Sequence, residues 1–252
     1  MQQDALRFFR AAIETPSPSG FEEPIQRLTR QYISSHCDNL RTDVHGNLIA
    51  SVGDPSGPCL MFAGHCDQIG MLISHIDDDG FLYAATIGGW DPQQLIGQAM
   101  TIWTSAGPVP AVISRKPIHL LTAAERDQVV KLTDLWLDIG ASDKAEASAL
   151  VRIGDPVTLD LQYRELLGDL VTGPGMDNKS GMWTVIEALR RAKLADSPLK
   201  CHLHSVATVQ EEIGLRGAKT AAGSINPAVA IAVDVTHASD CPTINKTRQG
   251  DI

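Results

Sequence analysis

The sequence predicts an α/β protein in which a domain of alternating helices and strands is interrupted by a smaller β-rich domain. Helix and strand patterns alternate at both ends of the chain, whereas short strands follow one another closely in the middle. The first pattern is typical of a sheet covered by helices, and the second of a small barrel. We therefore assign residues 1–70 and 166–252 to the outer domain and residues 71–165 to the insertion.

The outer domain is expected to begin with two helices. An amphipathic helix is predicted over residues 4–14, because three apolar residues share one of its faces: Leu6, Phe9 and Ile13. Ser19 and Glu22 have the Ser-x-x-Glu spacing of a capping box. This spacing predicts a second helix that continues to about residue 35.

Strand patterns follow, first in the outer domain and then in the insertion. The outer domain has them around residues 40–44, 47–52 and 59–63. In the insertion, one predicted hairpin turns at residues 78–80 and another at residues 106–108. The remaining elements of the insertion are two strands and two short helices, near residues 134–140, 155–161, 123–131 and 143–150.

The outer domain resumes with a second alternation of helices and strands. Helices are predicted at residues 180–194 and 216–223, and a buried strand at residues 199–209. The run of apolar residues at 228–233 is continuous, which predicts a strand buried on both faces of the sheet.

Composition and charge limit the function of the chain. Its net charge of -9 argues against general nucleic-acid binding, which needs clustered Lys and Arg. No apolar run approaches the ~20 residues that span a bilayer, and the N-terminus lacks the apolar core of a signal peptide. Five cysteines without a CxxC pair fit a reducing compartment. We expect a cytoplasmic protein that binds neither nucleic acid nor membrane.

Acidic and imidazole side chains gather at the ends of the predicted strands or in the loops that follow them. These candidates come from segments far apart in the sequence: His65, Asp67, Asp177, Glu211, Glu212 and Asp234. One imidazole and several carboxylates are the ligand chemistry of a hydrolytic two-metal centre. The sequence has no nucleophile elbow, phosphate-binding loop or dinucleotide-binding fingerprint that would favour another chemistry.

Each signal also has a simpler interpretation. His65 and Asp67 could be a lone histidine at a strand end beside a loop acid, and Asp177 could be a helix N-cap. Asp234 could cap the loop after its strand. Glu211 and Glu212 are harder to dismiss as a solvated surface pair, because apolar residues flank them and buried carboxylates need a positive partner.

Nine short segments carry a resemblance to a known family. They are SPSGFE at 17–22, VHGNL at 44–48, GHCDQIG at 64–70, IGGWD at 87–91, LDIGAS at 137–142, RIGDPV at 152–157, MDNKSG at 176–181, QEEIGLRGA at 210–218 and DVTHA at 234–238. In this order the chain resembles the dinuclear metallo-aminopeptidases that include glutamyl aminopeptidases and tetrahedral aminopeptidases, some of them labelled endoglucanases.

The resemblance implies a mixed-sheet zinc-peptidase domain interrupted by a barrel-like dimerisation domain. It implies two divalent metal ions per subunit, zinc first and cobalt or manganese as alternatives, held by His65, Asp177, Glu212 and Asp234. Glu211 matches the general base and Asp67 the residue behind His65. The implied reaction removes N-terminal residues from peptides, through a water shared by the two metals, in a homodimer or dodecamer.

Two departures from the family pattern bear on these expectations. Gln68 stands where the family usually has Glu. Family members also continue for roughly a hundred residues, the size of a small domain, beyond the position of Ile252, and supply a second histidine ligand there. The alternatives are therefore a fragment or inactive truncated paralogue that retains dimerisation, or a related co-catalytic zinc carboxypeptidase or deacylase. The IGGWD and RIGDPV segments disfavour the last of these.

Overall fold

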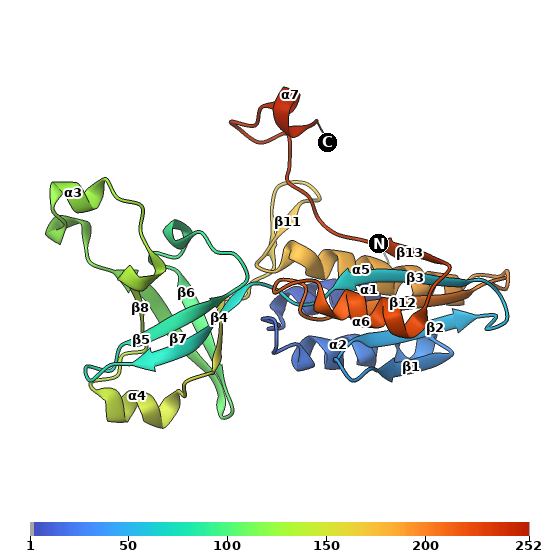
Figure 1. The fold of residues 1–252 in the computed structure, drawn as a ribbon, viewed down its shortest axis with the longest axis horizontal. Helices are drawn as coiled ribbons and strands as arrows, with labels where there is room; N and C mark the ends of the chain where they lie inside the picture. Colours follow the sequence, from blue (N-terminus) through green and yellow to red (C-terminus); the bar gives the residue numbers. More distant parts are fainter. Residues whose placement is uncertain (1–2, 252) are drawn as a thin grey trace.

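A computed structural model describes residues 3–251 and has two lobes, one built on a mixed sheet and one on a barrel (Figure 1). The predicted fold class is therefore confirmed. The ends of the predicted outer domain, residues 1, 2 and 252, lie outside the described part. No helix within it is both long and apolar enough to cross a membrane.

The larger lobe contains a five-stranded sheet in the order β1-β2-β12-β3-β13. Its strands are β1 (Asn39–Thr42), β2 (Leu48–Gly53), β3 (Cys59–His65), β12 (His202–Thr208) and β13 (Val229–Ala232). β12 and β13 run parallel to β3 on its two sides, so their carboxyl ends meet at one end of the sheet. β2 is antiparallel to both β1 and β12.

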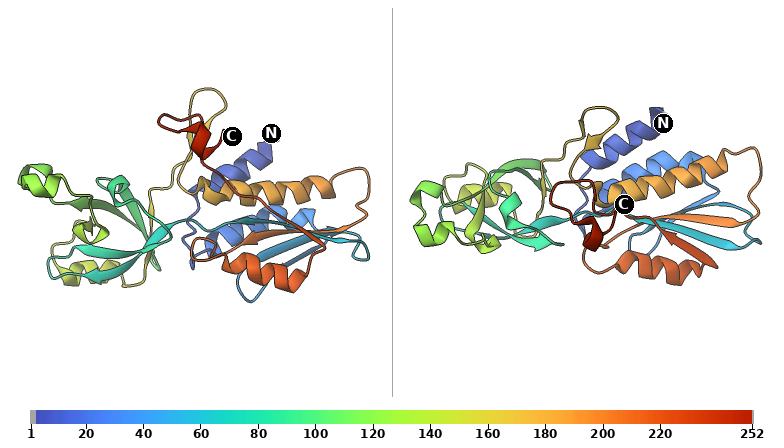
Figure 2. Two further views of the ribbon diagram at one scale, coloured as in Figure 1. Left: turned by 45° about the horizontal axis from the view of Figure 1, so that its top comes forward. Right: turned by 90° about the horizontal axis from the view of Figure 1, so that it is seen from above.

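Helices cover both faces of this sheet, as Figure 2 shows. α1 (Gln3–Glu14), α2 (Glu23–Ile33) and α5 (Met176–Lys193) lie on one face, and α6 (Arg216–Ile225) lies on the other. The main core forms between the three helices and the sheet. It contains, among others, Phe8, Ile25, Val185, Leu189 and Leu203. A smaller cluster packs beneath α6.

The smaller lobe is a closed barrel in the order β4-β5-β8-β7-β6-β9. Its strands are β4 (Gly70–Ile76), β5 (Leu82–Ile87), β6 (Ala99–Thr104), β7 (Gly107–Arg115), β8 (Leu135–Asp138) and β9 (Pro156–Leu159). Both predicted hairpins form, β4 with β5 and β6 with β7. α3 (Ala123–Arg126) and α4 (Lys144–Leu150) are its helices. The exact limits of the inserted domain stay a prediction.

Shorter elements complete the fold. A two-stranded ladder joins β10 (Arg164–Glu165) to β11 (Val171–Thr172), and α7 (Lys246–Gln249) lies near the C-terminus. Single 3₁₀ turns occupy residues Ser34–His36, Pro92–Gln94, Ile118–Leu120 and Leu132–Asp134.

Three local predictions are wrong. Phe9 and Ile13 are buried as predicted, but Leu6 is 40% exposed, because the buried face of α1 is centred toward Phe8 and Ala12. α2 forms where expected, but its N-cap residue Glu22 has helical angles and its side chain makes no capping hydrogen bond. The predicted capping box is therefore absent, and a real one stands at the start of α3.

The third error concerns β13, which was predicted to be buried on both faces. Its four residues are exposed, including Val229 and Ile231. β13 is the last strand in the sheet order, and its one neighbour in the described part of the chain is β3. An apolar run alone does not distinguish a central strand from one at an edge.

Candidate metal centre

His65 is the last residue of β3, and its buried ring lies among the candidate carboxylates. Its Nε2 atom is 3.2 Å from Asp177 Oδ1, 3.6 Å from Glu211 Oε2 and 3.9 Å from Asp234 Oδ1. Its Nδ1 atom is 2.9 Å from the main-chain oxygen of Asp67. Because a carbonyl oxygen only accepts hydrogen bonds, Nδ1 carries a proton and Nε2 faces the carboxylates.

The Asp67 carboxylate is fully buried and connects three segments of the chain. Its Oδ1 accepts a hydrogen bond from the backbone N–H of Glu211 (3.0 Å), and its Oδ2 accepts from that of Glu212 (3.1 Å). The Ser19 hydroxyl donates to Oδ2 at 2.5 Å. The carboxylate also lies 3.5 Å from His65 Nδ1. Asp67 thus holds the histidine and the two glutamates in one arrangement.

Asp177 lies at the start of α5 but does not cap that helix. It and Asn178 have non-helical angles, and the Asn178 side chain accepts from the Gly181 N–H at 2.9 Å, as a cap does. Asn178 also donates to the main-chain oxygen of Val233 at 2.8 Å. This contact ties the start of α5 to the segment that carries Asp234. Asp177 is left 62% exposed and free to face His65.

Glu211 and Glu212 follow β12, beyond a residue with left-handed backbone angles, Gln210 (φ 55°). The Glu211 carboxylate is 26% exposed and faces His65 Nε2. Glu212 lies against the barrel lobe, since a Cβ atom at Gly88 would come within 3.3 Å of Glu212 Oε2. The barrel segment IGGWD therefore borders the cluster. Gly88 leaves room there for the Glu212 side chain.

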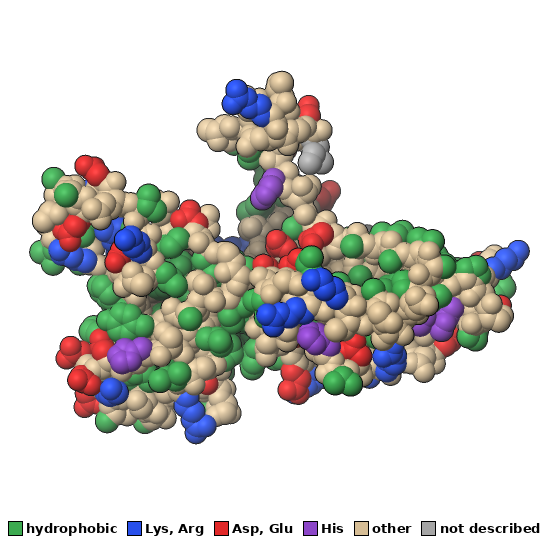
Figure 3. All heavy atoms as spheres, viewed as in Figure 1, with side chains coloured by type: hydrophobic (Ala, Val, Ile, Leu, Met, Phe, Trp, Pro, Cys, Tyr) green, Lys and Arg blue, Asp and Glu red, His purple; other side chains and the backbone are tan. Residues whose placement is uncertain are grey.

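All the predicted site residues thus lie together. Two groups offer ligand atoms within 4.8 Å of one another, and both contain His65: His65, Glu211 and Glu212 form one group, and His65, Asp177 and Asp234 form the other. Figure 3 shows acidic side chains gathered at the junction of the two lobes. One imidazole and four carboxylates are a suitable donor set for divalent metal ions.

Electrostatics support this fit. Burial lowers the pKa of His65, but hydrogen bonding to Asp67 and the charges of Asp67, Glu211 and Asp234 raise it to about 9. Burial and the nearby charge of Asp177 raise the pKa of Glu212 to about 7. Burial is also the main cause of the raised pKa of Glu211. Crowded carboxylates of this kind gain stability when a cation lies among them.

The pKa of Asp67 is shifted in the opposite direction. Burial raises its pKa, but the hydrogen bonds from His65, Ser19 and the Glu211 N–H outweigh burial and lower it. The group therefore stays ionised beneath the cluster. A fixed negative charge behind a histidine keeps that ring oriented and raises its basicity.

Sequence reasoning missed several residues that support the centre. Ser19 and Glu22 were assigned to a helix cap, although both are buried beside the cluster. Lys179 is the third such residue. It is fully buried, donates to Thr15 O (2.6 Å) and to Gln68 Oε1 (2.5 Å), and burial lowers its pKa to about 7. The only available signal was the position of these residues inside the family-like segments.

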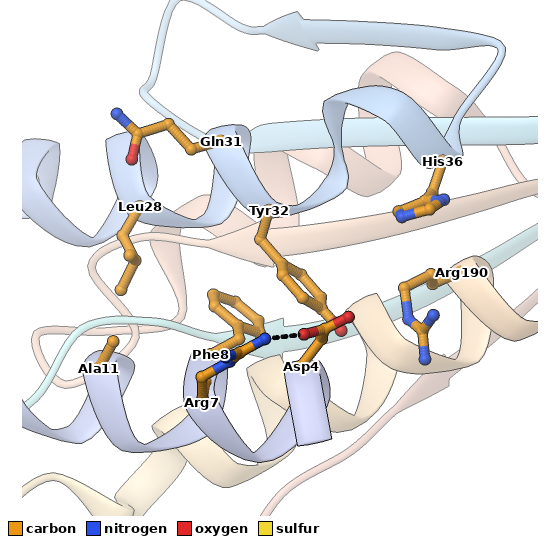
Figure 4. Close-up of a pocket in the computed structure, with 9 residues that line it drawn as sticks. All are labelled: Asp4, Arg7, Phe8, Ala11, Leu28, Gln31, Tyr32, His36 and Arg190. Carbon is orange, nitrogen blue, oxygen red and sulfur yellow. Dashed lines mark hydrogen bonds and ion pairs between the residues drawn. The ribbon is translucent and has the colours of Figure 1, made fainter. Parts of the chain in front are cut away.

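A separate cavity of about 460 Å³ lies between α1 and α2, with Phe8, Tyr32 and Arg190 in its lining (Figure 4). Arg190 is near the end of α5, ~20 Å along that helix from Asp177. Several polar side chains that line the cavity already have partners: Arg7 pairs with Asp4, and Tyr32 donates to Glu187. We assign no function to this cavity.

Comparison with known proteins identifies a family. A family model described as M42 glutamyl aminopeptidase matches residues 46–251. A putative aminopeptidase of Acetivibrio thermocellus is 39% identical over 224 residues, which is 89% of this chain and 64% of that protein. The chain thus spans somewhat less than two thirds of the length of that relative.

Solved structures of aminopeptidases are also similar to this chain. A TET aminopeptidase from a marine sediment archaeon, Thaumarchaeota archaeon SCGC AB-539-E09, superposes with a TM-score of 0.94 at 32% identity, covering 98% of this chain and 69% of that one. The Pyrococcus horikoshii TET1 peptidase gives a TM-score of 0.83 at 33% identity, with 91% and 68% covered. Its structure is described as assembling into a tetrahedron or a large octahedral shell.

The raised pKa values predict how the stability of the metal-free protein depends on pH. Glu212 (about 7 against 4.5) and His65 (about 9 against 6.5) bind protons more tightly in the folded than in the unfolded state. Their stabilising contribution is therefore present at low pH and is lost as the pH rises, through 4.5–7 for Glu212 and 6.5–9 for His65. We expect the Tm of chelator-treated Glu212→Gln to match that of the wild-type protein near pH 4.5. Above pH 7, the Tm of the variant should exceed that of the wild-type protein.

Thermal denaturation followed by circular dichroism across this pH range measures the effect. Glu165→Gln, at an exposed glutamate of β10, is the matched control and should follow wild type. A Glu212→Gln curve parallel to wild type at every pH would show that Glu212 titrates normally and would contradict the crowding described above.

Proposed function

Because this chain belongs to the M42 glutamyl aminopeptidase family, we propose that it acts as a metal-dependent aminopeptidase that releases N-terminal residues from peptides. The observation that carries the proposal is the convergence of His65 with four carboxylates from three other segments. Peptide hydrolysis suits such a site, because it needs an activated water and a polarised carbonyl group.

The proposed centre holds two divalent metal ions. We assign one ion to His65, Asp177 and Asp234, which form one of the two geometric groups. Glu212 would hold the second ion, with Asp177 shared between the two. When bound, the ions supply Lewis-acid chemistry that activates water and polarises the scissile carbonyl. Zinc is the first choice, with cobalt or manganese as alternatives, because histidine and carboxylate sites accept several such ions.

Glu211 is the proposed general base. Its carboxylate is partly exposed, faces the same His65 nitrogen as the ligands and has a raised pKa. A raised pKa suits a group that takes a proton from water and later gives it to the leaving amine. Asp67 would act indirectly, by orienting His65 and fixing the backbone of Glu211.

The protein is also proposed to form a homo-oligomer, a dimer through the barrel lobe or a larger assembly of dimers. The assembly described for the P. horikoshii TET1 peptidase supports this proposal. The barrel carries exposed apolar side chains that such a contact could cover, among them Val112, Ile118, Leu120 and Ile153.

Activity of the metal-loaded protein tests the proposed reaction. We expect release of free amino acids from the N-termini of short peptides, loss of this release on treatment with a chelator, and recovery on adding zinc or cobalt. Glu211→Gln removes the proposed base while keeping the volume of the side chain, so turnover should fall by ~100-fold or more.

Glu165→Gln is again the control and should retain wild-type turnover, because Glu165 is exposed and belongs to neither of the two groups that offer metal ligands. Peptide cleavage that persists in the presence of chelator, or full activity in Glu211→Gln, would exclude the proposed mechanism.

Light scattering coupled to size-exclusion chromatography measures the oligomeric state. We expect a mass of two protomers or a multiple of two. A substitution that places charge on the exposed apolar surface of the barrel, Ile118→Glu, should lower that mass if the barrel forms the contact. A strictly monomeric wild-type protein would refute the proposed assembly.

A further inference from the structure

Ser19 and Glu22 were expected to start a helix as a capping box, but their side chains point elsewhere. Ser19 and Glu22 are each only 7% exposed, and neither caps α2. Ser19 donates to the Asp67 carboxylate, and Glu22 Oε1 accepts a hydrogen bond from the backbone N–H of Gln210 at 3.1 Å. Both side chains therefore serve the loop that carries the proposed base and ligand.

Three successive backbone N–H groups in that loop donate hydrogen bonds to two buried carboxylates. The Gln210 N–H donates to Glu22, and the N–H groups of Glu211 and Glu212 donate to the two oxygens of Asp67. Gln210 has a φ of 55°, a conformation that non-glycine residues adopt rarely. The turn therefore needs outside support, and the Glu22 carboxylate lies where it can give that support.

Hydrogen bonds on both sides of Glu22 fix the backbone that carries it. The next turn of α2 carries Gln26, whose Nε2 donates to Ala207 O (2.9 Å) and Gly46 O (3.1 Å). Ala207 belongs to β12, the strand that leads into the loop. On the other side, the N–H of Gln68 donates to Ser17 O at 2.9 Å. Residues 17–26 are thus hydrogen-bonded both to β12, through Gln26, and to the loop after β3, through Ser17.

We propose that Glu22 is a positioning residue of the metal centre, one that fixes the turn at Gln210 and so sets where the carboxylates of Glu211 and Glu212 lie. This role rests on the proposed function for its catalytic consequence. Its structural consequence does not, because the hydrogen bond to the Gln210 N–H exists whatever reaction the site performs.

The requirement is for a hydrogen-bond acceptor, since the partner is a neutral amide. Glu22→Gln keeps an oxygen at the same position and should behave like wild type. Glu22→Leu keeps most of the volume but removes the acceptor, which leaves the Gln210 N–H without its partner. The matched control is Glu23→Gln, because Glu23 is an exposed neighbour on α2 that pairs with Arg27 on the helix surface.

The first measurement is amide hydrogen exchange at residues 210–212 in the metal-free protein, followed by NMR or mass spectrometry. Exchange there should be at least 10-fold faster in Glu22→Leu than in wild type, with the strands of the main sheet unchanged. Glu22→Gln and Glu23→Gln should exchange as wild type does. If leucine prevents folding, Glu22→Ala removes the same acceptor without crowding and is expected to give the same result.

The second measurement uses the metal-loaded protein. Glu22→Leu should lower kcat by roughly 10- to 100-fold and weaken zinc binding by a similar factor, the size found when groups behind metal ligands are removed. KM should change by less than about 3-fold, and Glu22→Gln should restore kcat. A general loss of stability would also speed exchange in the strands of the main sheet, which the first measurement follows.

The outcomes separate the two proposals. A wild-type protein without aminopeptidase activity would refute the proposed function, while exchange at residues 210–212 would still test the role of Glu22. Unchanged exchange in Glu22→Leu, or loss of zinc binding in Glu22→Gln equal to that in Glu22→Leu, would overturn the positioning role.

Discussion

The arrangement of this site depends on one buried negative charge, the carboxylate of Asp67. Burying an ion without partners costs several kcal/mol, and here both oxygens accept hydrogen bonds, from a serine hydroxyl and two backbone N–H groups. Those donors belong to segments more than forty residues apart from Asp67 in the sequence. The need to satisfy this single carboxylate therefore draws together the parts of the chain that carry His65, Glu211 and Glu212.

The sheet supplies the frame for this arrangement. β3, β12 and β13 run parallel, so the residues that follow them meet at one end of the sheet, as the carboxyl ends of parallel strands do. The hydrogen bond from Asn178 to the main-chain oxygen of Val233 holds the start of α5 at this same end of the sheet. The same end of the sheet faces the barrel, because β3 ends at His65 and β4 begins at Gly70. Both lobes therefore border the cluster.

Much of this could be predicted from the sequence. The hairpin turns, the alternation of helices and strands, and the acids at strand ends all rest on local patterns, and the joint occurrence of those acids identified the cluster. Three features could not be read locally. The exposure of β13 depends on strand order, the partners of Ser19 and Glu22 depend on contacts across the fold, and a capping-box spacing is the same whether or not its side chains turn toward the helix.

Metal binding by Asp67→Asn tests the central claim most directly. The substitution keeps the size of the side chain, removes its charge and replaces one acceptor oxygen by a donor, so that a backbone N–H of the loop loses its partner. Isothermal titration of the metal-free protein with zinc should show binding weakened by roughly 10- to 100-fold in a variant that remains folded. Zinc binding equal to that of wild type would contradict the claim that Asp67 organises the site.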